Sequence, residues 1–198
     1  MILVLATRNP GKVREIEKAL GLPGVEFHSL ADYPDLPEIE EDGATFSENA
    51  RKKARFVCQV LGLPVLADDS GLVVDALNGA PGIFSARFAG PQATDKQNNE
   101  KLLALLQGLP EEKRTARFVC HLVYCDPQGQ TLETQGVCEG RITQAPKGEQ
   151  GFGYDPIFSL PEWGKTMAEL PLERKNQISH RGQALKKMRT LLRDLLGS

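Results

Sequence analysis

Two consecutive aspartates, Asp68 and Asp69, are the residues of this sequence best suited to catalysis. They follow a short apolar segment, residues 63–67, which is typical of a buried strand. Carboxylates at such a strand end lie where open α/β sheets place ligands, and they can bind Mg²⁺. Because adjacent residues of an extended chain point opposite ways, we expect only one aspartate to face a ligand. A turn before Ser70 and Gly71 is the structural alternative.

A second group of acids lies in the segment 32–42, which holds six acidic residues and no basic one. Its carboxylates, among them Glu40 and Glu41, are further candidates for a divalent cation. A solvated acidic loop explains the run more simply.

The segment Thr7-Arg8-Asn9-Pro10-Gly11-Lys12 joins an apolar run to a helix start and is suited to phosphate. Such a turn presents free backbone N–H groups, and Lys12 adds an ammonium. It is not a Walker A loop, because it has one glycine and Val13 follows the lysine. An ordinary strand-to-helix turn is the alternative.

Two further sets lie toward the C-terminus. In Gly151–Pro156, the glycines flanking Phe152 let the backbone approach a ligand, and the ring can stack on a base. In the second set, Ser179 caps the last helix and places His180 and Arg181 at its positive end, with Lys175 nearby. A tight turn with a core Phe, a helix-end histidine and a surface ion pair are the alternatives.

The elements that must position these residues alternate between strand and helix, which predicts an α/β fold. Helical spacing and capping residues predict helices that begin at Pro10, Thr45, Thr94 and about Ser179. Apolar β-prone runs predict strands at 2–6, 25–30, 63–67, 118–124 and 131–142, the last two forming a hairpin. On the helix from Thr45, Lys53 lies at the edge of the apolar face and can reach a ligand.

Composition excludes several classes of protein. The chain has 198 residues, 25% of them charged, and a net charge of −2, which excludes a disordered chain and a polyanion binder that acts through its bulk field. Its apolar runs are far shorter than the roughly 20 residues of a membrane span. The four cysteines form no CxxC pair, and no export signal is present. We therefore expect reduced thiols in a cytoplasmic protein, with neither a membrane nor a nucleic acid as partner.

Taken together, the motifs resemble one family. The order TRNPGK, EEDGATFSENARKKA, ADDSGL, GAPGIFSARFAG, GFGYDPIF and SHRGQAL is similar to that of the inosine triphosphate pyrophosphatase family, bacterial type. The resemblance covers residues 2–196. It implies an elongated mixed α/β sheet with flanking helices, a single domain over residues 1–198 with two lobes around a central cleft, and a homodimer.

The resemblance also implies a reaction and its residues. Noncanonical purine nucleotides (ITP, dITP and XTP) would be hydrolysed with Mg²⁺ between the α and β phosphates, giving the monophosphate and pyrophosphate. Asp69 would be the general base near the metal, with Glu40 or Glu41 as a further ligand. The substrate-binding residues carried over are Thr7, Arg8, Asn9, Pro10, Gly11, Lys12, Lys53, Ser70, Phe152, Gly153, Tyr154, Asp155, Lys175, His180 and Arg181.

Two other functions remain open from the residues. A related pyrophosphatase acting on modified pyrimidine triphosphates would use the same phosphate chemistry. A non-catalytic nucleotide sensor or RNA-binding module would use the basic faces at 51–55 and 186–193. The absence of exposed aromatics between those basic residues argues against RNA binding.

Overall fold

Seven strands form one mixed sheet, in the order β2-β1-β3-β4-β5-β6-β7, in the computed structural model, which describes residues 1–197. The strands are β1 (Ile2–Leu5), β2 (Glu26–Ser29), β3 (Val65–Val74), β4 (Thr115–Cys125), β5 (Thr131–Ile142), β6 (Phe158–Leu160) and β7 (Lys165–Thr166). The helices are α1 (Pro10–Leu20), α2 (Phe46–Leu61), α3 (Asp95–Leu105), α4 (Leu172–Ile178) and α5 (His180–Leu196). The predicted mixed α/β fold is confirmed.

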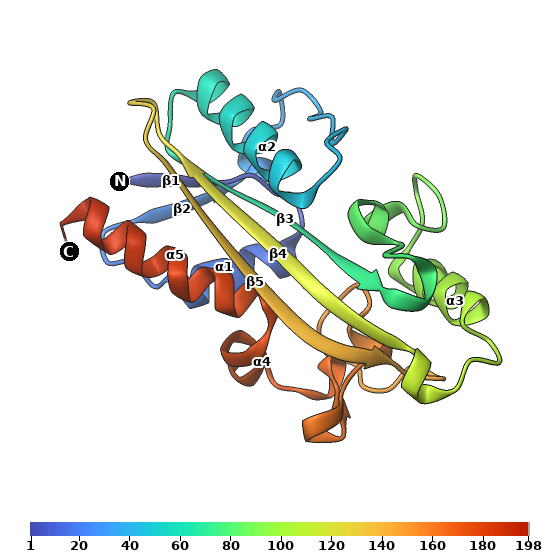
Figure 1. Cartoon of the computed structure of the whole chain (residues 1–198). Helices are drawn as coiled ribbons and strands as arrows, with labels where there is room; N and C mark the ends of the chain where they lie inside the picture. The colour runs from blue at the N-terminus through green and yellow to red at the C-terminus, as the bar shows by residue number, and fades with distance from the viewer. Residues whose placement is uncertain (198) are drawn as a thin grey trace. The chain divides into compact units, whose positions relative to one another are not determined.

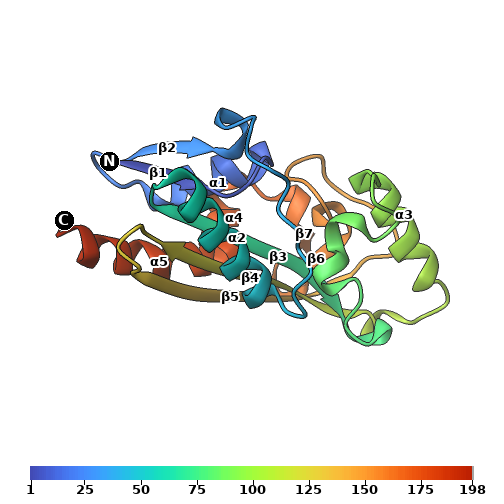
Figure 2. The same cartoon turned by 90° about the horizontal axis from the view of Figure 1, so that it is seen from above.

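The sheet contains both parallel and antiparallel pairs of strands. β1 runs parallel to β2 and to β3, whereas β6 is antiparallel to both β5 and β7. β2 lies at the edge of the sheet beside β1 (Figure 2).

The chain divides into two compact units. The first contains residues 1–69, 120–136 and 181 onward, and the second contains residues 70–119 and 137–180. The chain passes from one unit to the other within β3, β4, β5 and α5. The expected single domain with two lobes around a cleft stays a prediction.

In the first unit, α1 and α5 cover one face of the strands and α2 covers the other (Figure 1). Alternation along β1 explains the two layers, because side chains of a strand point to opposite faces in turn. Leu3 and Leu5 pack with apolar residues of α1 and α5, whereas Val4 and Ala6 pack with α2. The strand is therefore apolar on both faces, as a buried parallel strand requires.

The second unit has its own apolar core, built on Leu72, Leu102, Phe118 and Phe158. Its helix α3 begins with the predicted capping box. The hydroxyl of Thr94 accepts a hydrogen bond from the N–H of Gln97, and the Gln97 side chain accepts one from the N–H of Thr94. This box fixes the first turn of α3.

The predicted end of the third strand was wrong. β3 continues from Val65 to Val74, so the segment Asp68–Gly71 is strand rather than turn. Its neighbour β1 pairs with β3 only as far as Leu5 opposite Leu66. Asp68 and Asp69 therefore lie in the part of β3 that extends beyond the end of β1. Side chains from the segments that follow β1 can reach them there.

Candidate active site

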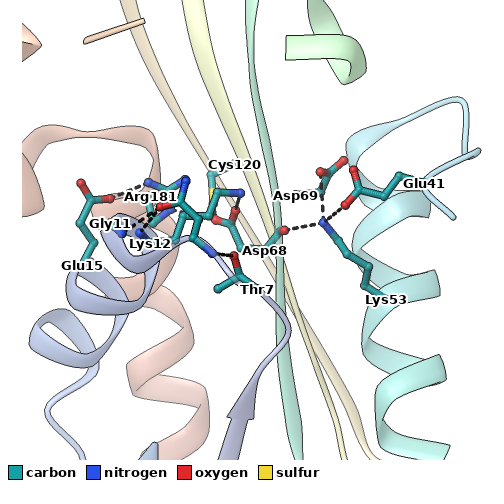
Figure 3. Close-up of polar contacts among 11 residues, drawn as sticks. Thr7, Gly11, Lys12, Glu15, Glu41, Lys53, Asp68, Asp69, Cys120 and Arg181 are labelled. Carbon is teal, nitrogen blue, oxygen red and sulfur yellow. Dashed lines mark hydrogen bonds and ion pairs between the residues drawn. The ribbon is translucent and has the colours of Figure 1, made fainter. Parts of the chain in front are cut away.

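The predicted site residues divide between the two units, and in the first unit they gather around Asp68 and Asp69. The alternation of β3 decides which way each carboxylate points. Leu66 belongs to the apolar cluster under α1 and α5, whereas Val65 and Ala67 belong to the cluster under α2. Asp68 therefore points toward α1 and α5, and Asp69 points toward α2, as Figure 3 shows.

Asp68 is the centre of a buried network of charges. Its carboxylate forms an ion pair with Lys12 of α1 and accepts a hydrogen bond of 2.9 Å from Nε of Arg181 in α5. The guanidinium of Arg181 also donates to Oε2 of Glu15 at 2.5 Å, and the thiol of Cys120 lies 3.3 Å from Asp68 Oδ2. Two acids and two bases balance their charges here, which is what makes burial of the group tolerable.

The pKa shifts of this network follow from its geometry. Burial opposes the negative charge of Asp68, but Arg181 and Lys12 outweigh it and hold the pKa of Asp68 well below its ordinary value. Burial likewise opposes the charge of Arg181, whereas Asp68 and Glu15 raise the pKa of its guanidinium. Asp68 is therefore an anion at neutral pH, engaged by its own chain and unsuited to accept a proton from water.

Asp69 lies in a different environment on the other face. Nζ of Lys53 lies 3.4 Å from Asp69 Oδ1 and 2.8 Å from Glu41 Oε1, and it donates to the main-chain oxygen of Asp68 at 2.8 Å. Burial raises the pKa of Asp69, and the ammonium of Lys53 offsets only part of this rise. Lys53 itself is buried, yet Asp69 and Glu41 raise the pKa of its amine.

The donor set on this face fits a hard divalent cation. Oδ2 of Asp69 is buried and has no hydrogen-bond partner within residues 1–197, and the Glu41 carboxylate approaches the same lysine. Carboxylate oxygens are the ligands that Mg²⁺ prefers, and it keeps several waters when protein supplies only one or two. Among residues 1–197 no group of three or more His, Cys, Asp or Glu forms a metal cage. The residues thus fit a partly hydrated Mg²⁺ rather than a closed site.

The structure distinguishes the two glutamates that the sequence left open. Glu41 contacts Lys53, whereas Glu40 is exposed and has no hydrogen bond or ion pair with another described residue. Of the pair, Glu41 is the one at the Asp69 cluster.

The expectation of free backbone N–H groups at the start of α1 was wrong. The side chain of Asn9 caps the helix, and its Oδ1 accepts hydrogen bonds from the N–H groups of Gly11 at 2.8 Å and Lys12 at 3.2 Å. Thr7 Oγ1 accepts from the N–H of Asn9 at 3.1 Å, and Pro10 has no N–H. This turn therefore supplies charge through the side chain of Lys12 rather than a cradle of open amides.

Arg8 lies apart from this cluster, and its guanidinium donates to the carbonyl of Leu36 at 3.4 Å. Within the turn that was predicted to hold phosphate, the side chain of Lys12 therefore joins the Asp68 network, whereas that of Arg8 contacts the carbonyl of Leu36.

In the second unit, the predicted residues Phe152, Asp155 and Lys175 form one group. Nζ of buried Lys175 donates to Asp155 Oδ2 at 2.8 Å and lies 4.7 Å from the centre of the half-buried Phe152 ring. The same Asp155 oxygen accepts from the N–H of Phe152 at 3.0 Å. Gly151, which has φ of 82°, brings the chain so close to Asp155 that a side chain there would collide with the carboxylate. The group thus places the Phe152 ring beside a cation that the Asp155 carboxylate holds in position.

The remaining predicted residues of this unit have structural contacts. The hydroxyl of Tyr154 donates to the carbonyl of Ser85 at 2.8 Å, and the ring of His180 stacks on Phe118 with centroids 4.7 Å apart. Ser70 follows Asp69 within β3. Gly153 adopts φ of 62°, a left-handed conformation that glycine tolerates best.

Comparison with known proteins identifies the family. A model described as the Ham1 family matches residues 3–191. The chain belongs to the Ham1 family. This confirms the resemblance that the motifs indicated, because curated relatives of the chain are named dITP/XTP pyrophosphatase. The dITP/XTP pyrophosphatase of Geobacter sulfurreducens is 56% identical over 98% of this chain and 96% of that protein. The dITP/XTP pyrophosphatase of Syntrophobacter fumaroxidans is 58% identical over 93% of this chain and 78% of that protein.

Solved structures of other Ham1 proteins have the same fold. The HAM1 protein from Coxiella burnetii superposes with a TM-score of 0.88 at 43% identity, covering 98% of this chain and 99% of that one. The Ham1 protein of Staphylococcus aureus gives a TM-score of 0.87 at 40% identity, with the same coverage.

Sequence reasoning left several residues of this Ham1 chain without a role. Asp68 was considered with Asp69 but without a partner, and Glu15 was not singled out. Asp95 and Asn99 of α3, which contact Gly153, were also missed. The one signal available was spacing, because Glu15 lies three residues after Lys12 and Asn99 lies four after Asp95, which places each pair on one helix face.

Proposed function

We propose that this Ham1 family member is a nucleoside-triphosphate pyrophosphohydrolase for noncanonical purine nucleotides. It hydrolyses ITP, dITP and XTP to the monophosphate and pyrophosphate. The names of its relatives support the reaction, and one observation at the site supports it most directly. Asp69 is a buried carboxylate with a raised pKa, and one of its oxygens has no partner in residues 1–197. An unsatisfied buried acceptor beside a lysine is suited to receive a proton from water.

The charges of the first unit have separate tasks in this proposal. Asp69 accepts the proton of the attacking water, and its raised pKa makes it a stronger base than an ordinary aspartate. Lys12 and Lys53, anchored through Asp68, neutralise the phosphates, because phosphoryl chemistry needs mainly positioning and charge compensation. The turn residues Thr7–Gly11 contribute by fixing Lys12, since Asn9 caps the helix that bears it.

We assign recognition of the base to the second group. Phe152 stacks on the purine, and Gly153, Tyr154 and Asp155 shape the loop that bears it. His180 donates a hydrogen bond to the 6-oxo group, with Ser70 and Lys175 as further contacts. Arg181, which the motif resemblance also assigns to the base, is held by Asp68 and Glu15 of the first unit. An adenine would place an amine against those donors, and each buried donor left unpaired costs about 1–3 kcal/mol, roughly ten- to a hundredfold in selectivity.

We propose Mg²⁺ as the cofactor, held by Asp69 and Glu41. When bound, such an ion polarises a phosphoryl oxygen and lowers the pKa of water. The chain's own contribution is to hold the Asp69 and Glu41 carboxylates together beside Lys53, whose raised pKa preserves its positive charge.

A panel of nucleoside triphosphates with Mg²⁺ tests the proposal. Pyrophosphate and orthophosphate are measured separately for ITP, dITP, XTP, ATP, GTP and a methylated UTP. We expect pyrophosphate from ITP, dITP and XTP, with much slower turnover of ATP. Release of orthophosphate contradicts cleavage between the α and β phosphates, and preference for the methylated UTP moves the protein to pyrimidine substrates.

Two further statements stay predictions, the first based on the resemblance and the second on the cysteine pattern and the expected lack of an export signal. They are a homodimer and a cytoplasmic location, and light scattering of the purified protein measures the first. Within residues 1–197, none of the helices combines the length and apolar character needed to cross a bilayer.

A further inference from the structure

We propose that Asp95 and Asn99 of α3 are positioning residues that fix Phe152 and thereby set the affinity for the nucleotide base. This inference rests on the proposed role of Phe152 and extends it to a helix without an assigned function. Both residues act through the main chain of Gly153, the neighbour of Phe152.

The two contacts hold the two peptide groups on either side of Gly153. Oδ2 of Asp95 accepts a hydrogen bond from the N–H of Gly153 at 2.7 Å, and Nδ2 of Asn99 donates to the carbonyl of Gly153 at 3.0 Å. Asp95 and Asn99 lie four residues apart and so share one face of α3. Asp95 thus holds the peptide that follows Phe152, and Asn99 holds the next one, so both are fixed by a helix rather than by their own loop.

The other side of Phe152 is fixed independently. Its own N–H donates to Asp155 Oδ2 at 3.0 Å, and that carboxylate is held by Lys175 at 2.8 Å. The ring-bearing residue thus has anchored peptides before and after it. Gly151 and Gly153 have left-handed φ angles, so without these anchors the loop would have unusual freedom.

Asn99 has a feature that stability alone does not explain. Its side chain is buried, and its Oδ1 has no hydrogen-bond partner within residues 1–197. An apolar residue at this position would not bury an unsatisfied oxygen, but it also could not donate a hydrogen bond to the carbonyl of Gly153. We therefore attribute the presence of an asparagine to that hydrogen bond.

The adjacent residue Asn98 provides a matched control. It is also buried in α3 and also bonds main-chain groups, but those of another segment. Its Nδ2 donates to the carbonyl of Ala86 at 3.1 Å, and its Oδ1 accepts from the N–H of Ala89 at 2.8 Å. Loss of Asn98 removes two side-chain hydrogen bonds to the main chain and loss of Asn99 removes one, yet of the two only Asn99 contacts the neighbour of Phe152.

The experiment compares the kinetics of ITP hydrolysis in Asp95→Ala, Asn99→Ala and Asn98→Ala. We expect KM to rise about tenfold in the first two, with kcat within about twofold of the wild type, because misplacing a binding group weakens binding. Asn98→Ala keeps the wild-type KM. Asp95→Asn retains an acceptor for the N–H of Gly153, so we expect its KM to be near that of the wild type. If Asp95 acted only through its charge, the KM of Asp95→Asn would instead rise as in Asp95→Ala.

A double-mutant cycle with Phe152→Ala then tests whether the effect passes through the ring. If Asp95 acts through Phe152, Asp95→Ala adds no further rise in KM once the ring is absent. Additive effects, or equal KM changes in Asn98→Ala and Asn99→Ala, overturn the inference. If the wild type fails to hydrolyse ITP, the proposed function fails instead, and the two failures are therefore distinguishable.

Discussion

Asp68 and Asp69 are consecutive in β3 but point to opposite faces of the strand, and their pKa values shift in opposite directions. Asp68 is paired with Arg181 and Lys12, which lowers its pKa, whereas burial raises the pKa of Asp69 and outweighs the effect of nearby Lys53. One carboxylate therefore holds the site together, and the other is available for chemistry. This contrast allows the same Asp→Asn change to be tested twice at adjacent positions.

The change Asp69→Asn should abolish activity without loss of stability. We expect hydrolysis of ITP to fall about 10²- to 10⁴-fold, the usual contribution of a general base. The folded pKa of Asp69 is above its ordinary value of 3.8, so its ionised form opposes folding at any pH above that folded value. In buffer with a chelator at pH 7, urea unfolding should give Asp69→Asn at least the wild-type free energy of unfolding. Near-normal turnover would remove Asp69 from the general-base role.

The change Asp68→Asn should have the reverse effect on stability. It leaves Lys12 and Arg181 with only Glu15 to balance them, and breaking a buried charge network in this way costs about 3–5 kcal/mol. Chemical unfolding at pH 7 measures the loss. A variant as stable as Asp69→Asn would show that the network contributes little.

The same residue predicts how the protein responds to acid. Because the folded pKa of Asp68 lies below 3.8, its stabilising effect is complete above pH 3.8 and is lost as the pH falls toward the folded value. With a chelator present, the free energy of unfolding should decrease with falling pH below about 3.8, the ordinary pKa of Asp. Asp68→Asn should show a shallower decrease over this range, and an identical slope in both proteins would contradict the assignment.

Much of this arrangement could be predicted locally. The caps of α1, α2 and α3 at Asn9, Thr45 and Thr94 follow from residue chemistry within one helical turn, and their helices begin where the sequence indicates. The continuation of β3 was missed because Asp-Asp-Ser-Gly is typical of a turn. The segment instead continues in the sheet, where β3 lies beside the distant strand β4, and the side chain of Asp68 is bound by Lys12 and Arg181, 56 and 113 residues away.

In the candidate site, too, contacts between residues far apart in the sequence could not be predicted. Motif order predicted Phe152 and Lys175 as site residues, and the structure brings them together, but motif order did not reveal the α3 residues that hold Gly153 from 58 and 54 residues away. Such contacts depend on how α3 packs, and α3 has no sequence motif of its own beyond a capping box. Capping chemistry is local and readable, whereas a side chain that binds a distant main-chain group leaves no pattern in one sequence.

The two glutamates predict a selective effect on metal affinity. Glu41→Gln should raise the Mg²⁺ concentration for half-maximal activity, because it removes the carboxylate that lies with Asp69 beside Lys53. Glu40→Gln removes an equal charge from an exposed side chain and should leave it unchanged. Titration of activity with Mg²⁺, together with calorimetry of Mg²⁺ binding, measures both variants. Equal shifts would mean that the acidic loop acts only through its overall charge.

Phe152→Ala should weaken binding of the substrate more than it slows the reaction. Base–aromatic stacking is worth about 1–3 kcal/mol, so the KM for ITP should rise roughly five- to 150-fold while kcat changes little. Phe152→Tyr keeps a stacking surface beside Lys175 and serves as the control, with a KM near that of the wild type. A KM unchanged in Phe152→Ala would remove the ring from the base site and leave its cation–π contact with Lys175 as a purely structural one.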